Sequence, residues 1–484
     1  MTIWFSSFID EASMRSRRPN ALCFLATVCC AAAFTTGCAN LNRPDDAALY
    51  EQAMSGIQPP EHWVASAAAA AFSPQWAGFA AQGTLEALID EAIANNMDLR
   101  AAASRLQQAA HQARLAGAAL LPTVGLGART ATDPTPGSAF SANGYAVLMS
   151  WEIDLWGRAR AEKLSAEAGY RSAEADYAYA RQSIGALTVR SWLAALEASG
   201  QLQLAKDLAV ATDEQLNLIR YRRQIGKTGE LEVAFWSEQA GAASDAVAKY
   251  EQARSEALRA LELILGRYPS ASVQADEAIP DAPPPLSSGL PLDLLDRRPD
   301  LVAARERVIS AYFGAEEAKA ARLPAISIFA GAGRFTKDYS GLAASMQTWV
   351  FPLGASLVWP LFDAGRRQIT LQLRTEQQRE ALALYARVIL TAMAEVENGL
   401  TGEYQLAVRE QSLQRQLAES RRALALAQVQ RDIGRVDDFD VLQRKRDLLH
   451  VQGNLLHIRA LRLVQRVNLH LALGGEFASD DASR

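Results

Sequence analysis

Cysteine is scarce in this chain of 484 residues: it has four, and none occurs after residue 38. Cys23, Cys29 and Cys30 fall in a segment that has the pattern of a cleaved secretion signal, so the mature chain keeps only Cys38. A single cysteine excludes a disulfide framework and a cysteine-based metal site within one chain.

Long apolar runs and catalytic motifs are also missing. After the amino-terminal segment no stretch of about 20 apolar residues occurs, which excludes a membrane-spanning helix. The five histidines are scattered, and no Gly-x-Ser-x-Gly motif is present. Gly226-Lys227-Thr228 imitates a phosphate-binding loop but lacks its first glycine and its preceding strand. The net charge of −5 argues against a nucleic acid partner. We therefore expect no enzyme activity, no cofactor and no metal.

The first 37 residues predict a lipoprotein signal peptide. Arginines at 15, 17 and 18 precede an apolar run at 21–34, and small residues at 35–37 lead to Cys38. An exported chain that keeps this one cysteine resembles a bacterial lipoprotein, in which Cys38 would carry lipid, palmitate included. Ala39 favours the outer membrane, whereas Thr35 departs from the leucine usual at that position. The alternative is a buried thiol beside an ordinary cleavage site, and Met14 is an alternative start.

The chain contains one unit twice. Asp98-Leu99 and Leu121-Pro122 recur as Asp300-Leu301 and Leu323-Pro324, displaced by 202 residues. The displacement is 208 residues for the pairs Trp151 and Trp359, Gly157-Arg158 and Gly365-Arg366, Ile225-Gly226 and Ile433-Gly434, and Leu265-Gly266 and Leu473-Gly474. A single step of six residues marks a tolerant loop within a duplicated architecture.

Periodicity predicts the same order of elements in both copies. Helical spacing precedes each Leu-Pro pair, alternation of period two follows it, and two further helices complete the copy. Asp98 and Asp300 are expected to cap the first of these helices. The expected segments are a lead-in at 38–83, a first copy at 84–266 (strands about 122–155; helices 98–120, 159–224 and 229–265), a proline-rich linker at 267–292, a second copy at 293–474 (strands about 324–361; helices 300–322, 367–432 and 437–472) and a tail at 475–484.

Each expected hairpin has one face of large apolar side chains and one face of small or polar ones. The residues placed on the apolar, membrane-facing side are Tyr145, Val147, Met149, Trp151, Leu357 and Trp359. A soluble antiparallel sheet packed on helices would explain the pattern, and so would a sheet with lipid on one side and water on the other. The two tryptophans suit a membrane boundary.

The expected helix lengths match one another within each copy. The helix before the hairpin has about 23 residues and the last helix about 37, so that end to end they span roughly 90 Å. The proline-free long helix between them spans roughly 100 Å. Two stacked helices beside one long helix predict a tall wall of antiparallel coiled coil.

Four strands cannot close a barrel, since the smallest membrane barrels need about eight. Open sheet edges in lipid cost on the order of several kcal/mol for each unpaired backbone group. If the hairpins span a membrane, several chains must therefore pool them. Two chains would give eight strands and three would give twelve, and only the larger barrel leaves an aqueous lumen, which the helices would extend.

Several short motifs occur in a fixed order and spacing: Asn95–Arg100, Leu121-Pro122, Arg298-Pro299-Asp300-Leu301 with Ala303-Ala304, Leu323-Pro324, Trp359–Gly365 and Glu395-Val396-Glu397-Asn398. In these residues the sequence resembles the TolC-like outer membrane factors, in particular the NodT-type lipoproteins of RND efflux. The resemblance implies an α+β membrane protein, a homotrimer with a twelve-stranded β-barrel in the outer membrane lipid and an α-helical tunnel through the periplasm. It also implies a periplasmic adaptor protein and an inner-membrane RND-type transporter as partners, in a pump of the kind that gives multidrug resistance.

The turns after the long helices are the expected periplasmic end of the tunnel. Gly226, Gly434 and Arg435 lie at their tips, where an adaptor would dock. By resemblance, Asp437 and Asp440 fall where family members place the carboxylates of the periplasmic aperture, with Asp438 between them. Rings of like charge at a threefold axis select cations. The alternative is that these acids cap the returning helix.

The predicted function is a passive exit duct for small molecules such as drugs, with transport energy supplied by the partners. Two alternatives stand beside it. The exit channel of a type I protein secretion system would share the fold, and a lipid-anchored periplasmic coiled-coil scaffold would have soluble hairpins.

Overall fold

The computed structural model describes residues 41–65, 83–132, 140–275, 278–283, 289, 291–339 and 346–477. Cys38 and the expected signal peptide lie outside these residues. The chain forms two compact units. Among the described residues, the sheet unit comprises those within 41–43, 117–162 and 316–371, and the helical unit comprises those within 44–116, 163–315 and 372–477. No helix in the described part of the chain combines the length and the apolarity needed to cross a lipid bilayer.

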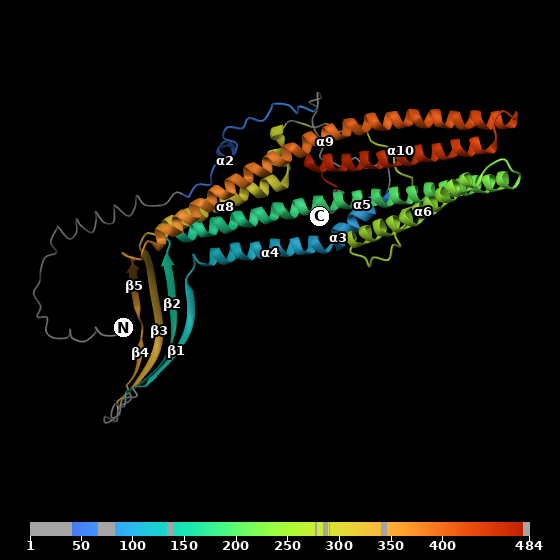
Figure 1. The fold of residues 1–484 in the computed structure, drawn as a ribbon. Coiled ribbons are helices and arrows are strands. Elements are labelled where there is room, and N and C mark those ends of the chain that lie inside the picture. The colour runs from blue at the N-terminus through green and yellow to red at the C-terminus, as the bar shows by residue number, and fades with distance from the viewer. Residues whose placement is uncertain are drawn as a thin grey trace, which may run out of the picture. The chain divides into compact units, whose positions relative to one another are not determined.

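The sheet combines strands of both copies. β1 (Thr123–Thr132) and β2 (Phe140–Ile153) come from the first copy, and β3 (Ala325–Tyr339), β4 (Met346–Val350) and β5 (Leu353–Val358) from the second. All pairs are antiparallel, in the order β1-β2-β3, and β3 pairs with both β4 and β5 (Figure 1). Because β4 and β5 lie one after the other along β3, the sheet is four strands wide, as expected, and its fourth strand is interrupted.

The interruption lies at Phe351-Pro352. Proline has no amide hydrogen for the ladder, but the Pro352 carbonyl accepts a hydrogen bond from the Gly331 amide at 2.8 Å. Trp359, which the alternation placed in a strand, comes directly after the end of β5 at Val358. The strand prediction is therefore wrong for this residue.

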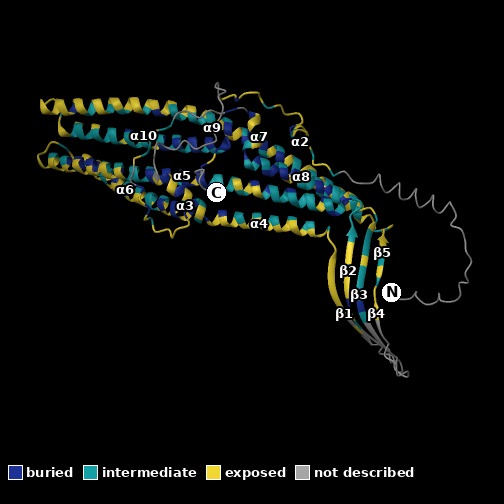
Figure 2. Ribbon diagram, turned by 180° about the vertical axis from the view of Figure 1, so that it is seen from behind, coloured by how far each residue is buried: buried dark blue, intermediate teal, exposed yellow. Residues whose placement is uncertain are grey.

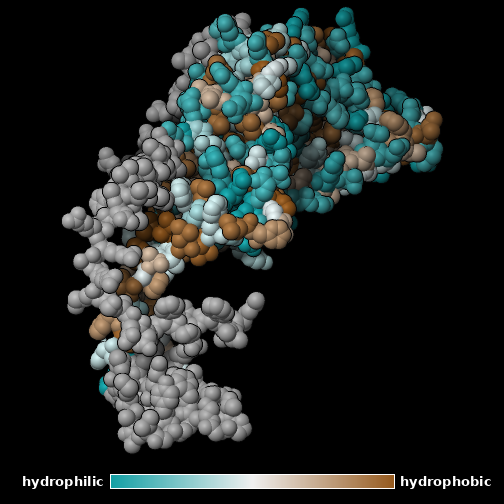
Figure 3. All heavy atoms as spheres, turned by 90° about the vertical axis from the view of Figure 1, so that its left-hand side faces the viewer, coloured by the Kyte–Doolittle hydropathy of each residue, from teal (hydrophilic) through white to brown (hydrophobic). Residues whose placement is uncertain are grey.

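Cross-strand register places many of the large apolar residues, though not Leu148 or Phe329, on one face of the sheet. Val147 of β2 lies opposite Leu126 of β1 and Ala332 of β3, and Leu357 of β5 lies opposite Ile326 of β3. Leu126 is 76% exposed and Leu357 is 62% exposed. Figure 2 shows β1 in yellow over most of its described length, and Figure 3 shows hydrophobic side chains on the visible described part of the sheet. The apolar face is therefore left open to its surroundings.

Glycines crowd the opposite face. A Cβ atom on Gly333 would lie 2.6 Å from the Cβ of Ala146, and one on Gly354 would overlap the ring of Phe329. Directly paired residues approach this closely where a sheet curves toward the face that they share, because curvature brings the side chains on the concave side together. The glycine-bearing face, which also carries Leu148 and Phe329, is therefore concave, and the face that carries Leu126, Val147 and Leu357 is convex.

Helices make up most of the remaining chain, and their lengths repeat. In chain order they are α2 (Asp46–Ala53), α3 (Gly83–Asn95), α4 (Met97–Ala118), α5 (Arg158–Gln224), α6 (Glu230–Ile264), the 3₁₀ turn η1 (Pro291–Asp293), α7 (Leu294–Arg297), α8 (Pro299–Ala320), α9 (Arg366–Asp432) and α10 (Asp438–Ala472). α5 and α9 have 67 residues each, α4 and α8 have 22, and α6 and α10 have 35.

Each copy joins the end of its last helix to the start of the helix before its hairpin. In the first copy the Asn96 side-chain amide donates a hydrogen bond to the Ile264 carbonyl at 3.0 Å. In the second, the Arg298 guanidinium donates to the Ala472 carbonyl, also at 3.0 Å. These residues correspond through the displacements of 202 and 208, so the same joint occurs twice. The two short helices stacked in this way, of 22 and 35 residues, lie end to end and are together ten residues shorter than the long helix of 67.

A glycine permits the close approach at each joint. Gly266 has φ +73° and Gly474 φ +80°, a region that side-chain-bearing residues rarely adopt. A Cβ atom on Gly266 would lie 2.7 Å from the Asn95 carbonyl oxygen, and one on Gly474 would lie 3.0 Å from that of Arg297.

The starts of α4 and α8 differ from the predicted caps. The Asn96 side-chain oxygen accepts from the Leu99 amide at 3.0 Å, so Asn96 and not Asp98 caps α4. α8 begins at Pro299, which suits a first helical position because its missing amide hydrogen needs no partner there. Asp300 accepts two hydrogen bonds from the Arg298 guanidinium, at 3.0 and 2.7 Å, and accepts one from the next amide.

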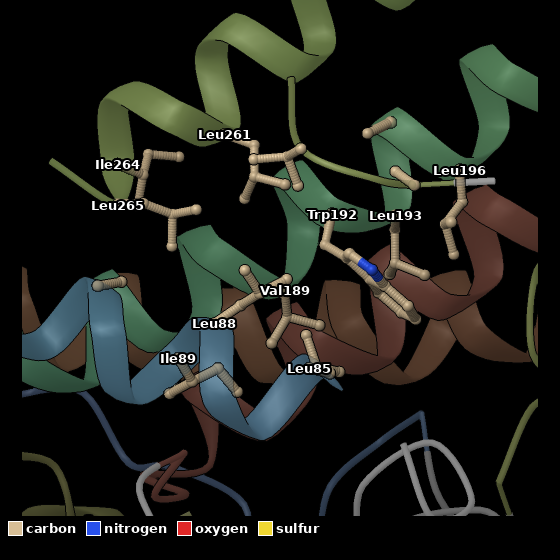
Figure 4. Close-up of a cluster of buried hydrophobic side chains, with 14 of the residues drawn as sticks. Leu85, Leu88, Ile89, Val189, Trp192, Leu193, Leu196, Leu261, Ile264 and Leu265 are labelled. Carbon is tan, nitrogen blue, oxygen red and sulfur yellow. The ribbon is translucent and has the colours of Figure 1, made fainter. Parts of the chain in front are cut away.

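The main hydrophobic core surrounds the middle of α5. Figure 4 shows Trp192 and Leu193 of α5 among side chains from α3 and the end of α6, and Trp192 is almost fully buried. Leu463 and Val467 of α10 complete this core. Phe477, which falls in the segment expected to be a tail, packs into the same core.

The lead-in contains a short helix, α2. Its Asp46 pairs with Arg305 of α8 at 3.3 Å. Further on, the Glu397 carboxylate of α9 accepts hydrogen bonds from the Val64 and Ala65 amides at 2.8 and 2.9 Å. The lead-in is therefore attached to the second copy.

Candidate functional site

The two turns at the ends of the long helices share one backbone design. Gly226 has φ +73° and Gly434 φ +74°. After Gly226, the Lys227 amide donates to the Arg222 carbonyl at 2.9 Å, and after Gly434 the Arg435 amide donates to the Gln430 carbonyl at 2.8 Å. This is the usual way in which glycine ends a helix, and it leaves the predicted tip residues exposed.

The three predicted aperture carboxylates begin α10. Asp437 is its N-cap, and its side chain accepts from the Phe439 and Asp440 amides at 2.9 and 3.3 Å. The Asp440 side chain accepts in return from the Asp437 amide at 3.4 Å. Asp438 lies in the first turn, 3.7 Å from Arg431 of α9. Asp437 and Asp440 therefore do cap the returning helix, and all three carboxylates are exposed in the single chain.

The two turns are held together by side chains that the sequence did not single out. The Arg222 guanidinium of α5 forms an ion pair with Asp437 and lies 5.5 Å from the centre of the Phe439 ring. Trp236 of α6 packs edge-on against Phe439, with ring centres 5.4 Å apart. Arg446 of α10 lies 4.9 Å from the Trp236 ring. Two aromatic rings between two guanidinium groups thus join the first copy to the second.

Two signals in the sequence could have identified this contact between the two turns. Arg222-Arg223 ends the long helix of the first copy, whereas acids follow the corresponding turn of the second, so the two turns have complementary charge. Phe235-Trp236 also places two large aromatic residues next to each other, close to the turn. Neither signal says which residues meet, because that depends on how two hairpins 200 residues apart pack.

Large apolar side chains are exposed at both tips. Leu231, in the first turn of α6, is 84% exposed, and Ile225, Phe235 and Ile433 are also exposed. Exposed apolar residues gathered at one place, beside charged ones, are typical of protein–protein contacts.

The predicted membrane-facing residues lie together on the convex face of the sheet, except that Trp359 comes after β5. The exposed ones are Tyr145, Val147, Trp151, Leu357 and Trp359, and Met149 is partly covered. The indole of Trp151 donates a hydrogen bond to the Leu120 carbonyl at 3.0 Å, so this ring is fixed at the end of its strand. Cys38, the expected lipid attachment site, lies outside the described residues.

Comparison with protein families gives one match that covers most of the chain. The sequence model of the family described as "outer membrane efflux protein" matches residues 88–267 and 290–475. Among curated proteins, the pyoverdine export outer membrane protein OpmQ of Pseudomonas aeruginosa is 30% identical over 448 residues, 88% of this chain and 93% of the relative. The toluene efflux pump outer membrane protein TtgF of Pseudomonas putida is 30% identical over 410 residues, 83% of this chain and 85% of the relative.

Solved structures agree with the fold. A crystal structure of CusC, in a study of transmembrane channel formation, superposes with a TM-score of 0.70 at 25% identity and covers 86% of this chain and 97% of that one. The Campylobacter jejuni CmeC outer membrane channel has a TM-score of 0.77 at 20% identity, covering 92% and 96%.

Proposed function

This chain belongs to the outer membrane efflux protein family, and we propose from that premise that three copies form the passive exit duct of a tripartite pump for small molecules. It is an outer membrane efflux channel. Channels of this family are homotrimers that work with an adaptor and an inner-membrane pump. The RND type of that pump, the lipid on Cys38 and the roles of individual residues are parts of the proposal.

The observation that carries the proposal is the open, curved sheet. Its convex face exposes large apolar side chains, and among the described strands β1 has a neighbour on one side only. An apolar convex face suits lipid, and an unpaired edge in lipid requires another strand. Each chain supplies a sheet four strands wide, so three chains would supply twelve strands and would place the glycine-bearing face toward the lumen.

The turns at Gly226 and Gly434 would form the periplasmic end of the duct. Asp437, Asp438 and Asp440 from three chains would line its aperture with carboxylates, a charge that favours the entry of cations. The exposed apolar residues beside Gly226, Gly434 and Arg435 would provide the contact for the adaptor.

The substrates would be small organic molecules. This part of the proposal rests on the relatives, two of which are named for pyoverdine export and toluene efflux. Deleting the gene and measuring the sensitivity of the host to organic solvents and antibiotics would test it. Increased sensitivity that plasmid-borne wild-type protein reverses is the expected result, and unchanged sensitivity to every compound would contradict it.

A reconstitution experiment tests the duct itself. We expect the purified full-length protein to have the mass of a trimer in detergent and to make lipid vesicles permeable to small solutes, because three sheets are needed to close the barrel. The Cys38→Ser variant should still fractionate with the outer membrane, since the sheet and not the lipid would hold it there.

The same measurements distinguish a lipid-anchored scaffold. A scaffold predicts a Cys38→Ser protein that is released into the periplasm and leaves vesicles sealed. A monomer that never permeabilises vesicles would overturn the proposed function.

A further inference from the structure

A pocket of about 500 Å³ opens in the helical unit between α5, α9 and α10. Polar side chains from all three helices line it: Tyr179 and Arg190 from α5, Glu395 and Asn398 from α9, and Gln465 and Asn468 from α10. The volume is in the range of sites that bind small molecules.

Arg190 carries a charge that its own surroundings do not balance. Its guanidinium donates to the Asn468 side-chain oxygen at 2.8 Å, and within the described residues it forms no ion pair. The side chain is partly buried, and this burial lowers the pKa of Arg190 from its ordinary value. A guanidinium has five N–H donors, so most of them are left for an anion. A partly desolvated cation of this kind binds a carboxylate well.

The opposite charge lies on another wall of the pocket. Arg298 holds Asp300 at 2.7 Å and Glu395 at 2.7 Å, and we call these three residues the Arg298 cluster. It contains two carboxylates and one guanidinium, which leaves one negative charge in excess. The Arg298 side chain is buried, whereas that of Glu395 is 46% exposed and lines the pocket. The excess charge is therefore accessible at Glu395.

The pocket adjoins the main core at Leu471, and the rest of its α10 wall faces away from that core. On α10, Val467 and Leu463 pack into the core, and Gln465 stands two residues from each of them, so that it faces the other way. α3, residues of the linker and Phe477 cover the core side of the helices. In the proposed trimer the uncovered side is the one that can line a lumen.

We propose that this pocket binds zwitterionic small molecules in the wall of the duct, with their carboxylate at Arg190 and their ammonium group at Glu395. The Tyr179 hydroxyl and the Asn398 amide line the same pocket and offer further hydrogen-bonding groups to a bound molecule. This inference rests on the proposed function and names a class of compound that would bind at this site during its passage through the duct.

The test uses the full-length trimer in detergent and the fluorescence anisotropy of norfloxacin, which carries a carboxylate and an amine. Two related probes distinguish the contribution of the carboxylate from that of the amine, since nalidixic acid lacks the amine and norfloxacin methyl ester lacks the carboxylate. We expect Arg190→Gln to weaken the binding of norfloxacin at least about tenfold and to weaken that of nalidixic acid, without changing that of the ester. Glu395→Gln should weaken norfloxacin binding but not nalidixic acid binding.

Arg220→Gln is the matched control, because it removes an exposed arginine from the same helix and should leave norfloxacin binding unchanged. Asn398→Trp, at an exposed position on the pocket wall, should block the pocket even if a charge variant fails to fold. Equal norfloxacin affinity in wild type, Arg190→Gln and Asn398→Trp would overturn the inference. Wild-type trimers that conduct ions but bind no norfloxacin would overturn it and leave the proposed function standing.

Discussion

Single residues of the helical unit hold buried charge by sharing it among several hydrogen bonds. Glu262 of α6 is fully buried, and its carboxylate accepts from the Ala271 and Ser272 amides at 2.6 Å and from the Val273 amide at 3.2 Å. Burial alone would raise the pKa of Glu262, but these hydrogen bonds outweigh it and lower the pKa to about 2. One carboxylate thus fixes the start of the linker to the end of α6.

Glu262→Gln should destabilise the protein at neutral pH and flatten its acid response. The charged hydrogen bonds contribute about 2–3 kcal/mol, and an amide group would also place its own donor among three amides. Because the folded pKa lies below the ordinary value of 4.5, this contribution is complete above about pH 4.5 and is lost as the pH falls toward 2. Thermal midpoints measured between pH 7 and pH 3 should fall more steeply for wild type than for the variant. Glu256→Gln, at an exposed position of the same helix, is the control, and parallel curves for wild type and Glu262→Gln would contradict the prediction.

The two helix joints should respond differently to truncation. Arg298→Ala would leave Asp300 and Glu395 without their shared cation, at a cost of about 3–5 kcal/mol. Asn96→Ala would remove neutral hydrogen bonds, at a cost of about 1–3 kcal/mol. Chemical denaturation of the two variants would measure the difference. Equal losses would mean that the charge of the second joint contributes nothing to stability.

Whole elements follow from sequence pattern more closely than their ends do. Helical and alternating periods gave the type and order of the helices and strands in both copies, because each period reflects which face is buried. The cap at Asn96 was missed because any short polar residue near a helix start fits the pattern, and only the contact made chooses among them. The break at Phe351-Pro352 was missed because the alternation resumes after it in the same phase.

The curvature of the sheet predicts a difference between neighbouring residues of β3. Gly333→Leu should prevent assembly, because even a Cβ atom at this position lies 2.6 Å from that of Ala146 and 2.8 Å from a backbone oxygen. Ala332→Leu, on the convex face, should assemble normally. Trimer yield from outer membrane extracts would compare the two variants. Equal yields would show that the concave face has room for side chains.

The molecule as a whole shows why the candidate site was only partly predictable. Duplication located both tips, since Gly226 and Gly434 correspond. The partners of Asp437 were not predictable, because Arg222 and Phe439 meet it only through the packing of one hairpin on the other. A local pattern contains no information on such packing.

Conductance of the trimer in planar bilayers would test the aperture. Asp437→Ala and Asp440→Ala should each reduce the preference for cations, because three carboxylates leave the aperture. Arg222→Ala should increase it by releasing the Asp437 carboxylate from its ion pair. Arg223→Ala, which removes a neighbouring cation paired with Glu230, is the control for net charge. Unchanged selectivity in both Asp437→Ala and Arg222→Ala would exclude these residues from the aperture.

The equal helix lengths limit how a gene of this kind can change. Seven residues inserted into α5 would move its turn and the start of α6 outward, so that the end of α6 would no longer reach α4. Either α4 or α6 would then have to gain as many residues, and the second copy would need the same two changes. A mutation that lengthens a single helix is therefore a defect until three others follow it. Related sequences should therefore differ in helix length by whole helical turns added to both copies together. Insertions and deletions of one or a few residues should be confined to the loops.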